Sequence, residues 1–337
     1  MKHLLPPVAQ YFRANLHTHS TISDGKFSPE ELKEIYKKQG YQILAITDHN
    51  VISDQTSLSD EQFLMLTGVE IAISEEGKDI QHKKSYHLTL ISKQPHHLWL
   101  PIVPKKPKEA YIPYLKLSES PDMERQHTAQ SVNRIIAACN EQEFLVTYNH
   151  PVWSLHNYTD YAPLKGLWAM EVCNYNALYV GYDGYSPMVY RDLLAKGNRI
   201  FPVCCDDMHN MNACGGAWIM VGAEKLTYDS VIDALERGDF YASTGPEIHS
   251  LTVDGTELKV TCSDAQSVSL ETDCRVAKRK HPTEPNGRLQ EATFDLTKWI
   301  NASQAADCVD DAYIRLTVYG PNGHRAYTRA YYLTELL

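Results

Sequence analysis

The first two thirds of the chain alternates short apolar runs with segments of helical periodicity, and this alternation constrains the fold more than any other feature. Alternating strands and helices predict a sheet of parallel strands that are joined by crossover helices. Several runs are apolar at consecutive positions, as expected for strands that are covered on both faces. The expected strands are residues 14–19, 43–49, 64–70, 86–91, 144–150, 167–174 and 199–207.

Helix signals lie between these strands. Ser28, Pro29 and Glu31 form a capping box with proline in the first turn, and Gly40 stands where this helix should end. Three more helices are expected at residues 128–141, 188–196 and 227–237.

The pattern changes twice along the chain. Residues 92–126 hold six prolines and show no periodicity, which is typical of an insertion, and we expect a lid over the site. From Ile248 onward, strands and turns replace the helical pattern, and Asp254-Gly255 is a hairpin signal. We therefore expect two domains, residues 1–246 and a small β domain at residues 247–337 that is like a β-sandwich.

Composition excludes some classes of function. A net charge of −10 makes a nucleic-acid polymer an unlikely partner, because such binding needs a dense Lys/Arg surface. A small phosphorylated substrate stays compatible, since metal ions can supply positive charge locally. The sequence has no apolar stretch long enough for a membrane helix and no signal-peptide pattern. Its eight scattered cysteines favour a reduced, cytoplasmic protein.

The expected strands share a second property, which is that they end in imidazole or carboxylate side chains. His17 and His19 lie two residues apart on a strand and so face the same side. Because the carboxyl ends of barrel strands meet on one surface, the later strand ends should bring their polar side chains to the same place. Burying so many polar groups without a cation would be costly. The later strands contribute Asp48, His49, Glu70, His87, Asn149, His150, Asp206, Asp207 and His209.

This set of motifs resembles the PHP (polymerase and histidinol phosphatase) superfamily of metal-dependent phosphoesterases. The resemblance spans roughly residues 14–210, and the segment at residues 240–246 looks like a further one found in many members. It rests on His17-Thr18-His19-Ser20, Ser23-Asp24-Gly25, Thr47-Asp48-His49-Asn50, Gly68-Val69-Glu70, the strand of His87, Asn149-His150-Pro151 and Asp207-Met208-His209.

The resemblance implies an α/β fold with a distorted (β/α)7 barrel that binds two or three divalent ions. Glu70 is implied as the bridging carboxylate. The position of Asp24 varies among relatives, some of which have histidine there. His82 is an alternative to His87 for one ligand position. The ligands implied, position by position, are His17, His19, Asp24, His49, Glu70, His87, His150, Asp207 and His209.

Mixed nitrogen and oxygen donors suit Zn, Mn or Fe. Paired ions lower the pKa of a bound water, so we expect a metal-activated hydroxide to hydrolyse a small phosphomonoester or phosphodiester. Asp48 and Asp206 are candidate catalytic residues that orient ligand imidazoles or move protons, although turn or capping roles are equally compatible with their positions. Arg191, Asn149 and Asn174 are the candidate substrate-binding residues.

Two alternatives stay open. Amidohydrolase-type hydrolysis of an amide or lactone would use the same nucleophile, but that class is expected to show a bridging lysine and a lone late aspartate, where this chain has Glu70 and the pair Asp207 and His209. The second alternative is a non-catalytic, metal-stabilised barrel in a larger assembly. The sequence carries no indication of the oligomeric state.

Overall fold

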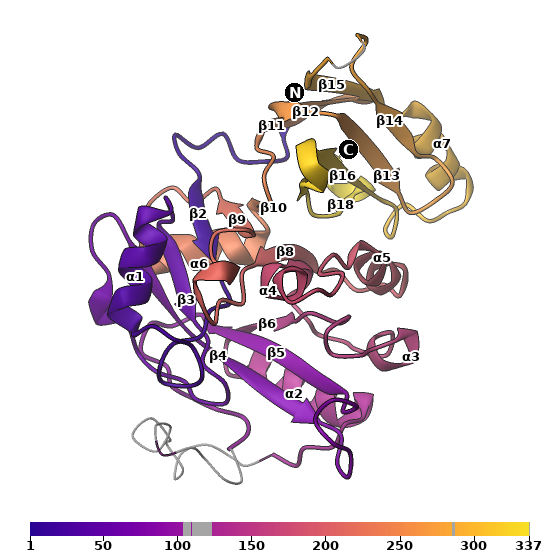
Figure 1. Cartoon of the computed structure of the whole chain (residues 1–337). Coiled ribbons are helices and arrows are strands. Elements are labelled where there is room, and N and C mark those ends of the chain that lie inside the picture. The colour runs from indigo at the N-terminus through magenta and orange to yellow at the C-terminus, as the bar shows by residue number, and fades with distance from the viewer. Residues whose placement is uncertain (104–108, 110–122, 285–286, 337) are drawn as a thin grey trace.

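The computed structural model describes residues 1–103, 109, 123–284 and 287–336, and over these residues the chain has an α/β fold (Figure 1). The helices are α1 (Pro29–Lys38), α2 (Ala129–Glu141), α3 (Tyr158–Tyr161), α4 (Tyr175–Tyr179), α5 (Pro187–Ala195), α6 (Tyr228–Arg237), α7 (Thr297–Ala305) and α8 (Leu333–Leu336). None of the helices in these ranges has the length and apolar character that spanning a bilayer requires.

The strands follow the predicted order over the first two thirds of the chain. Those of this part are β1 (Lys2–His3), β2 (Phe12–Asn15), β3 (Ile43–Ile46), β4 (Leu64–Ser74), β5 (Ser85–Ser92), β6 (Phe144–Tyr148), β7 (Ala169–Asn174), β8 (Phe201–Cys205), β9 (Trp218–Val221) and β10 (Phe240–Ser243). Those of the last part are β11 (Ile248–Asp254), β12 (Glu257–Ala265), β13 (Ser267–Thr272), β14 (Lys278–Lys280), β15 (Leu289–Asp295), β16 (Tyr313–Tyr319), β17 (Arg325–Tyr327) and β18 (Tyr331–Tyr332).

The large sheet is mixed rather than parallel. Strands β2, β3 and β4 pair in parallel, as do β6, β7 and β8, but β5 is antiparallel to both of its neighbours. The expectation of an all-parallel sheet is therefore wrong at β5. The reason is the connection, because residues 75–84 form a turn without a crossover helix, and a short connection returns the chain antiparallel.

The α/β class is confirmed, but the closed (β/α)7 barrel is not. The ladder of paired strands runs from β2 to β8 on one side and continues from β2 into β9 and β10 on the other. Within the described residues, the two ends of the β2–β8 series meet through one parallel bridge between Thr18 and Met208, just past β2 and β8. The bond from His19 N to Met208 O, 3.0 Å long, supports this bridge, so the strand ends that carry the polar side chains lie together.

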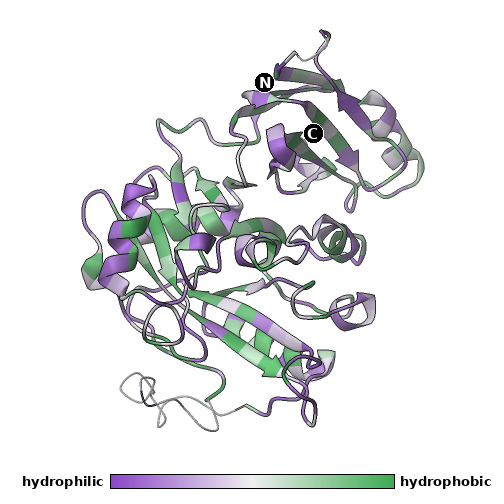
Figure 2. Ribbon diagram, viewed as in Figure 1, coloured by the Kyte–Doolittle hydropathy of each residue, from purple (hydrophilic) through white to green (hydrophobic). Residues whose placement is uncertain are grey.

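Helices and strands form as their local sequences predict. The capping box at Ser28 and Glu31 is present at the start of α1, which confirms that prediction. Leu32 and Tyr36 are the buried face of this helix. Hydrophobic residues colour the strand interiors green in Figure 2, while the outer faces of the helices are mostly purple. The apolar stripe of each helix thus covers the sheet.

The last part of the chain is β-rich, and both termini lie there (Figure 1). The predicted hairpin is confirmed, since β11 and β12 pair around Gly255, whose φ of 58° suits glycine. The region is not all-β, because α7 buries Trp299 and Ile300 in its core. Strand β1 pairs with β11, so the start of the chain belongs to this sheet. The domain boundary after residue 246 stays a prediction, and most of the predicted lid at 92–126 lies outside the described residues.

Candidate metal centre

The structure brings together all nine side chains that the resemblance implied as ligands. Their nitrogen and oxygen atoms form overlapping groups in which every pair of ligand atoms lies within 4.8 Å. The groups are His17, His150 and Asp207; His17, His19 and Glu70; His49, Glu70 and His87; and His19, Asp24, His49 and His209.

Glu70 is the centre of the inner part of this cluster. It lies in the middle of β4 and not at its end, and its carboxylate is fully buried. Its Oε1 is 3.0 Å from Nδ1 of His87 and 3.2 Å from Nε2 of both His17 and His150, and its Oε2 is 2.8 Å from Nδ1 of His49. One carboxylate thus touches four imidazoles from four other strands or strand ends.

Hydrogen bonds on the far side of each ring set which nitrogen faces the cluster. His17 donates from Nδ1 to Oε1 of Glu171 at 2.7 Å, so its Nε2 lone pair points toward Glu70. His150 Nδ1 lies 3.2 Å from Oγ of Ser154, and its Nε2 also faces Glu70. His209 donates from Nδ1 to the Asp207 carbonyl at 2.9 Å. These rings are therefore held with a free lone pair aimed inward, as metal ligands require.

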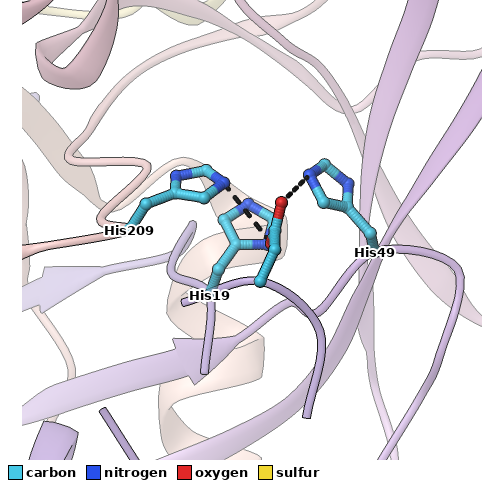
Figure 3. Close-up of side chains that lie close together, drawn as sticks. His19, His49 and His209 are labelled. Carbon is cyan, nitrogen blue, oxygen red and sulfur yellow. Dashed lines mark ion pairs between the residues drawn. The ribbon is translucent and has the colours of Figure 1, made fainter. Parts of the chain in front are cut away.

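The outer part of the cluster is more exposed. His19, His49 and His209 turn their rings toward one another, and dashed lines in Figure 3 mark the ion pairs between them and the carboxylate in their midst. Asp24 supplies that carboxylate, with its oxygens 3.5 Å from Nε2 of both His49 and His209 and 3.7 Å from Nδ1 of His19. The Asp24 side chain is 37% exposed, so this edge of the cluster faces solvent.

Asp48 has a different place from the one expected. Its carboxylate accepts hydrogen bonds from the backbone N–H and the hydroxyl of both Ser20 and Ser23, at 2.6–3.2 Å. These four bonds all go to the loop that carries Asp24, which is the turn or capping role that its position also allowed, and the catalytic role of Asp48 stays a prediction. Gly25 ends this loop, and a Cβ there would lie 2.0 Å from the His19 carbonyl oxygen, so only glycine fits.

Asp206 is also a loop organiser. Its carboxylate accepts from the backbone N–H groups of Gly215, Gly216 and Ala217 at 2.7–2.9 Å and from the Tyr36 hydroxyl at 3.1 Å. Burial raises its pKa to about 6. Within the described residues no bond from Asp206 to a cluster imidazole is present, so its contacts agree with the turn or capping role, and its catalytic role stays a prediction.

Glu171 is the residue that sequence reasoning missed. It lies in the middle of β7, is buried, and receives hydrogen bonds from His17 Nδ1 at 2.7 Å and from the His150 N–H at 2.9 Å. A lone carboxylate within the apolar run 169–174 was the signal that could have revealed it. It orients two predicted ligands at once.

The three predicted substrate-binding residues do not face the cavity as expected. Asn149 is buried and donates to Glu70 Oε1 at 2.8 Å, and Asn174 donates to Glu171 Oε2 at 2.9 Å. Their amides are therefore engaged by cluster carboxylates and not available to a phosphate. Arg191 is 56% exposed on α5 and pairs with Asp192 at 3.6 Å, outside the cavity. His82, the rival of His87, pairs with Asp79 in an exposed turn.

The backbone is unusual at three points around the cluster. Asn50, His150 and Asp207 have φ values of 53°, 22° and 53°, where residues other than glycine are uncommon. Strained backbone of this kind persists only where surrounding contacts fix it, and it gathers at functional sites. The Asp207 N–H, for example, donates to the His17 carbonyl at 3.0 Å, which joins two ligand segments.

Carboxylates raise the pKa of some cluster imidazoles, whereas burial lowers the pKa of His19 to about 3 and also lowers that of His87. Burial lowers the pKa of His17, but Asp207, Glu70 and Glu171 outweigh this and raise it well above its ordinary value. His209 has its pKa raised to about 9, because Asp24 and Asp207 overcome the effect of burial. Burial raises the pKa of Glu70, yet the imidazoles of His87, His17 and His49 hold it well below its usual range. A field that attracts protons in this way also attracts a metal cation.

Three buried atoms test whether a metal ion fits. His19 Nδ1, Glu70 Oε2 and Asp207 Oδ1 are buried and have no hydrogen-bond partner of normal geometry. Glu70 Oε2 lies 2.8 Å from His49 Nδ1, and Asp207 Oδ1 lies 3.1 Å from His19 Nε2, but neither pair is aligned as a hydrogen bond. Unpartnered buried polar atoms are costly, and a divalent cation would satisfy these. The donor set therefore fits metal ions.

A cavity of about 210 Å³ opens onto the cluster. It is lined by Asp24, His49, Glu70, His87, His150, Trp153, Asn176, Asp207 and His209. The ligand atoms are thus reachable by a small molecule from solvent.

The family model that describes the PHP domain matches residues 15–145. This segment is a PHP domain. The match confirms the family that the motifs predicted, and it includes Asp24, His49, Glu70 and His87 within the domain.

Two curated proteins align with part of this chain. A 5'-3' exoribonuclease of Haemophilus influenzae is 40% identical over 70 residues, which cover 20% of this chain and 26% of the relative. The DNA polymerase/3'-5' exonuclease PolX of Bacillus subtilis is 36% identical over 83 residues, covering 19% of this chain and 15% of the relative. The chain thus spans about a quarter of the first relative and less of the second.

Solved structures give a weaker likeness. A two-domain protein of Bacteroides vulgatus, described as containing a predicted PHP-like metal-dependent phosphoesterase, covers 98% of both chains at 14% identity with a TM-score of 0.45. An amidohydrolase of Chromobacterium violaceum covers 58% of this chain and 87% of its own, with 14% identity and a TM-score of 0.37. Likeness of this size supports neither a fold nor a function for this chain.

Proposed function

We propose that this protein is a metal-dependent hydrolase that cleaves a small phosphomonoester or phosphodiester. The observation that carries the proposal is that nine imidazole and carboxylate side chains from seven segments lie in one cluster. Three buried nitrogen and oxygen atoms of this cluster have no hydrogen-bond partner and could bind a metal ion. The PHP domain at residues 15–145 supports it, as does the likeness of this segment to an exoribonuclease and to a DNA polymerase/3'-5' exonuclease.

The proposed ligands are the nine residues named from the sequence, which hold two or three divalent ions. Mixed nitrogen and oxygen donors favour Zn, Mn or Fe. Ions bound here would activate water for hydrolysis and neutralise negative charge on a phosphoryl group. Glu70, which contacts four imidazoles, would be the central carboxylate ligand of these ions.

The other side chains keep this arrangement in place. Glu171 accepts from Nδ1 of His17, which leaves the His17 Nε2 facing inward, and it also accepts from the backbone N–H of His150. Asn149 fixes the Glu70 carboxylate. Asp48 holds the loop of Asp24. Outer contacts of this type orient ligands and tune their basicity. We therefore propose Glu171, Asn149 and Asp48 as positioning residues, while substrate binding by Arg191 and Asn174 stays a prediction.

Metal analysis and activity of one matched pair of variants test the proposal. The purified protein should contain transition metal and hydrolyse members of a phosphoester panel, whereas His17→Ala should lose at least about a hundredfold of this activity, a cost of several kcal/mol in the barrier. His82→Ala removes an exposed histidine that lies outside the cluster and should retain full activity. Unchanged turnover in His17→Ala would exclude the mechanism.

A second panel separates the alternatives. Amide and lactone substrates would be turned over in preference to phosphoesters if the amidohydrolase alternative were right. A metal-loaded protein that hydrolyses neither class would support the non-catalytic alternative. Because the curated relatives carry exonuclease names, an oligonucleotide belongs in the panel, although the net charge of −10 opposes polymer binding.

A further inference from the structure

A second cavity lies beside the metal cluster. Its volume is about 410 Å³, and it shares three wall residues, His49, His87 and Trp153, with the cavity that opens onto the cluster. Because the two cavities have walls in common, a molecule whose reacting bond lies at the cluster would extend its remaining group into the second cavity.

Four exposed apolar side chains contribute to the wall of this second cavity. Ile80 is 81% exposed, Trp153 41%, Leu155 40% and Tyr182 43%, and all four line it. Soluble proteins seldom leave several large apolar side chains exposed together unless they contact a ligand or a partner. The position of this wall beside reacting groups favours a ligand.

Trp153 joins the two cavities. Its indole packs edge-on against His150, with ring centroids 5.0 Å apart and planes at 80°, and lies 5.3 Å from the His87 ring. Both imidazoles belong to the cluster, so the indole ring directly borders the cluster. Tyr182 supplies a second aromatic side chain to the same cavity and lines it without contributing to the cluster cavity.

We propose that this second cavity binds a flat aromatic group of the substrate, on the side of the alcohol that leaves. The inference rests on the proposed function and deepens it by naming the substrate class as an ester with an aromatic ring close to the reacting bond. In the reaction, the oxygen of water bonds to phosphorus, the bond from phosphorus to the ester oxygen breaks, and the alcohol departs with a proton. An aromatic wall stabilises a flat ring better than a saturated one.

The size and polarity of the cavity agree with this occupant. Its volume exceeds the about 150 Å³ of a cavity that can hold benzene. Lys83 is half-buried in its wall, and Asn50, Ser74 and Ser85 add polar groups, so a ring with hydrogen-bonding edges would be accepted. Simple aryl groups and nucleobases share this chemistry, and the experiment has an arm for each.

The test compares two esters, one with an aromatic ring and one with a saturated ring of the same number of carbon atoms. Benzyl phosphate and cyclohexylmethyl phosphate have leaving alcohols of similar size and acidity, and we expect kcat/KM to favour the benzyl ester by about tenfold. The nucleobase arm compares adenosine 5'-monophosphate with ribose 5-phosphate. A larger preference in this second pair than in the first would identify the ring as a nucleobase, and a smaller one would identify it as a simple aryl group.

Variants test which side chains cause the preference for the benzyl ester. Tyr182→Ala and Trp153→Ala should reduce the benzyl preference to near unity, while Trp153→Phe should keep most of it because a ring remains. Tyr158→Ala is the matched control, because Tyr158 is 48% exposed and lines neither of these two cavities. Its benzyl preference should equal that of the wild type.

A binding measurement keeps this inference distinguishable from the proposed function. Benzylphosphonate and cyclohexylmethylphosphonate cannot be hydrolysed at the carbon–phosphorus bond, and calorimetry should show tighter binding of the benzyl compound to the wild type and not to Tyr182→Ala. Binding preference without turnover of any ester would exclude the proposed function alone. Equal binding of the two phosphonates, or a preference that Tyr182→Ala and Trp153→Ala both retain, would overturn the aromatic site.

Discussion

Two regions of this molecule use their buried space in opposite ways. At the ends of β2–β8, buried positions hold histidines and carboxylates that contact one another, and three of their polar atoms have no hydrogen-bond partner. In the C-terminal β-rich region, the core consists of side chains such as Trp299, Phe294 and Leu316. The first arrangement is costly and the second is favourable, so chemistry and stability are concentrated in different places.

The same difference is visible among buried histidines. His209 faces two carboxylates and has its pKa raised to about 9, whereas burial lowers the pKa of His156 to about 3. His156 lies between His127 and Tyr148, with neutral contacts of 3.3 Å and 2.6 Å. A buried histidine thus marks a cation site only when carboxylates surround it. Four substitutions test this comparison.

The largest effect is expected for Glu70→Gln. This change keeps the size of the side chain but removes the charge that four imidazoles contact, so activity should fall about a thousandfold or more. Metal content of the purified variant, measured with its kcat/KM, checks the prediction. A variant that kept both would show that the carboxylate has no part in metal binding, and Glu141→Gln in α2 is the exposed control.

Trp299→Ala should have the opposite effect to Glu70→Gln, because it should lower stability and leave activity unchanged. The indole is fully buried and donates to Asp273 at 2.8 Å, and its removal should lower the free energy of unfolding by about 3–5 kcal/mol through the cavity that it leaves. Denaturant unfolding measures this loss. Metal content and kcat/KM of the folded fraction should stay at wild-type values, and a large change in either would mean that the two regions are coupled.

Glu171→Gln should have an intermediate effect. The substitution removes a negative charge that orients His17 and His150 without contacting the metal itself, so metal affinity should weaken by about 10–100-fold. Competition with a chelator measures the affinity. Wild-type affinity in this variant would show that the missed carboxylate is not a positioning residue.

The effect that is smallest at neutral pH concerns acid stability. Below its ordinary pKa of 6.5, His156 takes up a proton in the unfolded chain but stays neutral in the folded one down to about pH 3. The free energy of unfolding should therefore fall as the pH decreases through this window, by up to about 1.4 kcal/mol per pH unit from this group. His156→Asn, which keeps an acceptor for Tyr148, should flatten the pH profile, and His82→Asn should not. Identical profiles for wild type and His156→Asn would contradict the prediction.

Sequence reasoning predicted the cluster because most of the ligands sit in short motifs just past a strand end, whereas Glu70 and His87 lie inside β4 and β5. His17, His150 and His209 come from segments far apart in the chain, yet the periodic strands that carry them were recognisable. Glu171 was missed because it lies inside a strand, where a lone carboxylate has no motif around it. Asn149 and Asn174 were identified as site residues but assigned the wrong partner, since a sequence does not say which acceptor an amide reaches.

The fold was predicted in outline and not in detail. The strands and helices of the first two thirds agree with their patterns to within a few residues, but the reversed direction of β5 depends on a turn at 75–84 that has the composition of an ordinary loop. Helix α7 was missed because it is short and its buried side chains Trp299 and Ile300 suit a strand equally well. The aromatic wall of Trp153 and Tyr182 depends on exposure, which no pattern in the sequence records.

Gly25 limits how the outer edge of the cluster can vary. With a hypothetical Cβ only 2.0 Å from the His19 carbonyl oxygen, the backbone of position 25 lies directly against the strand end and accepts no other residue type. The neighbouring position 24 has no such limit, because the side chain of Asp24 reaches solvent. Exchange of this one residue would then be the simplest way to change which ion the solvent-facing edge of the cluster prefers.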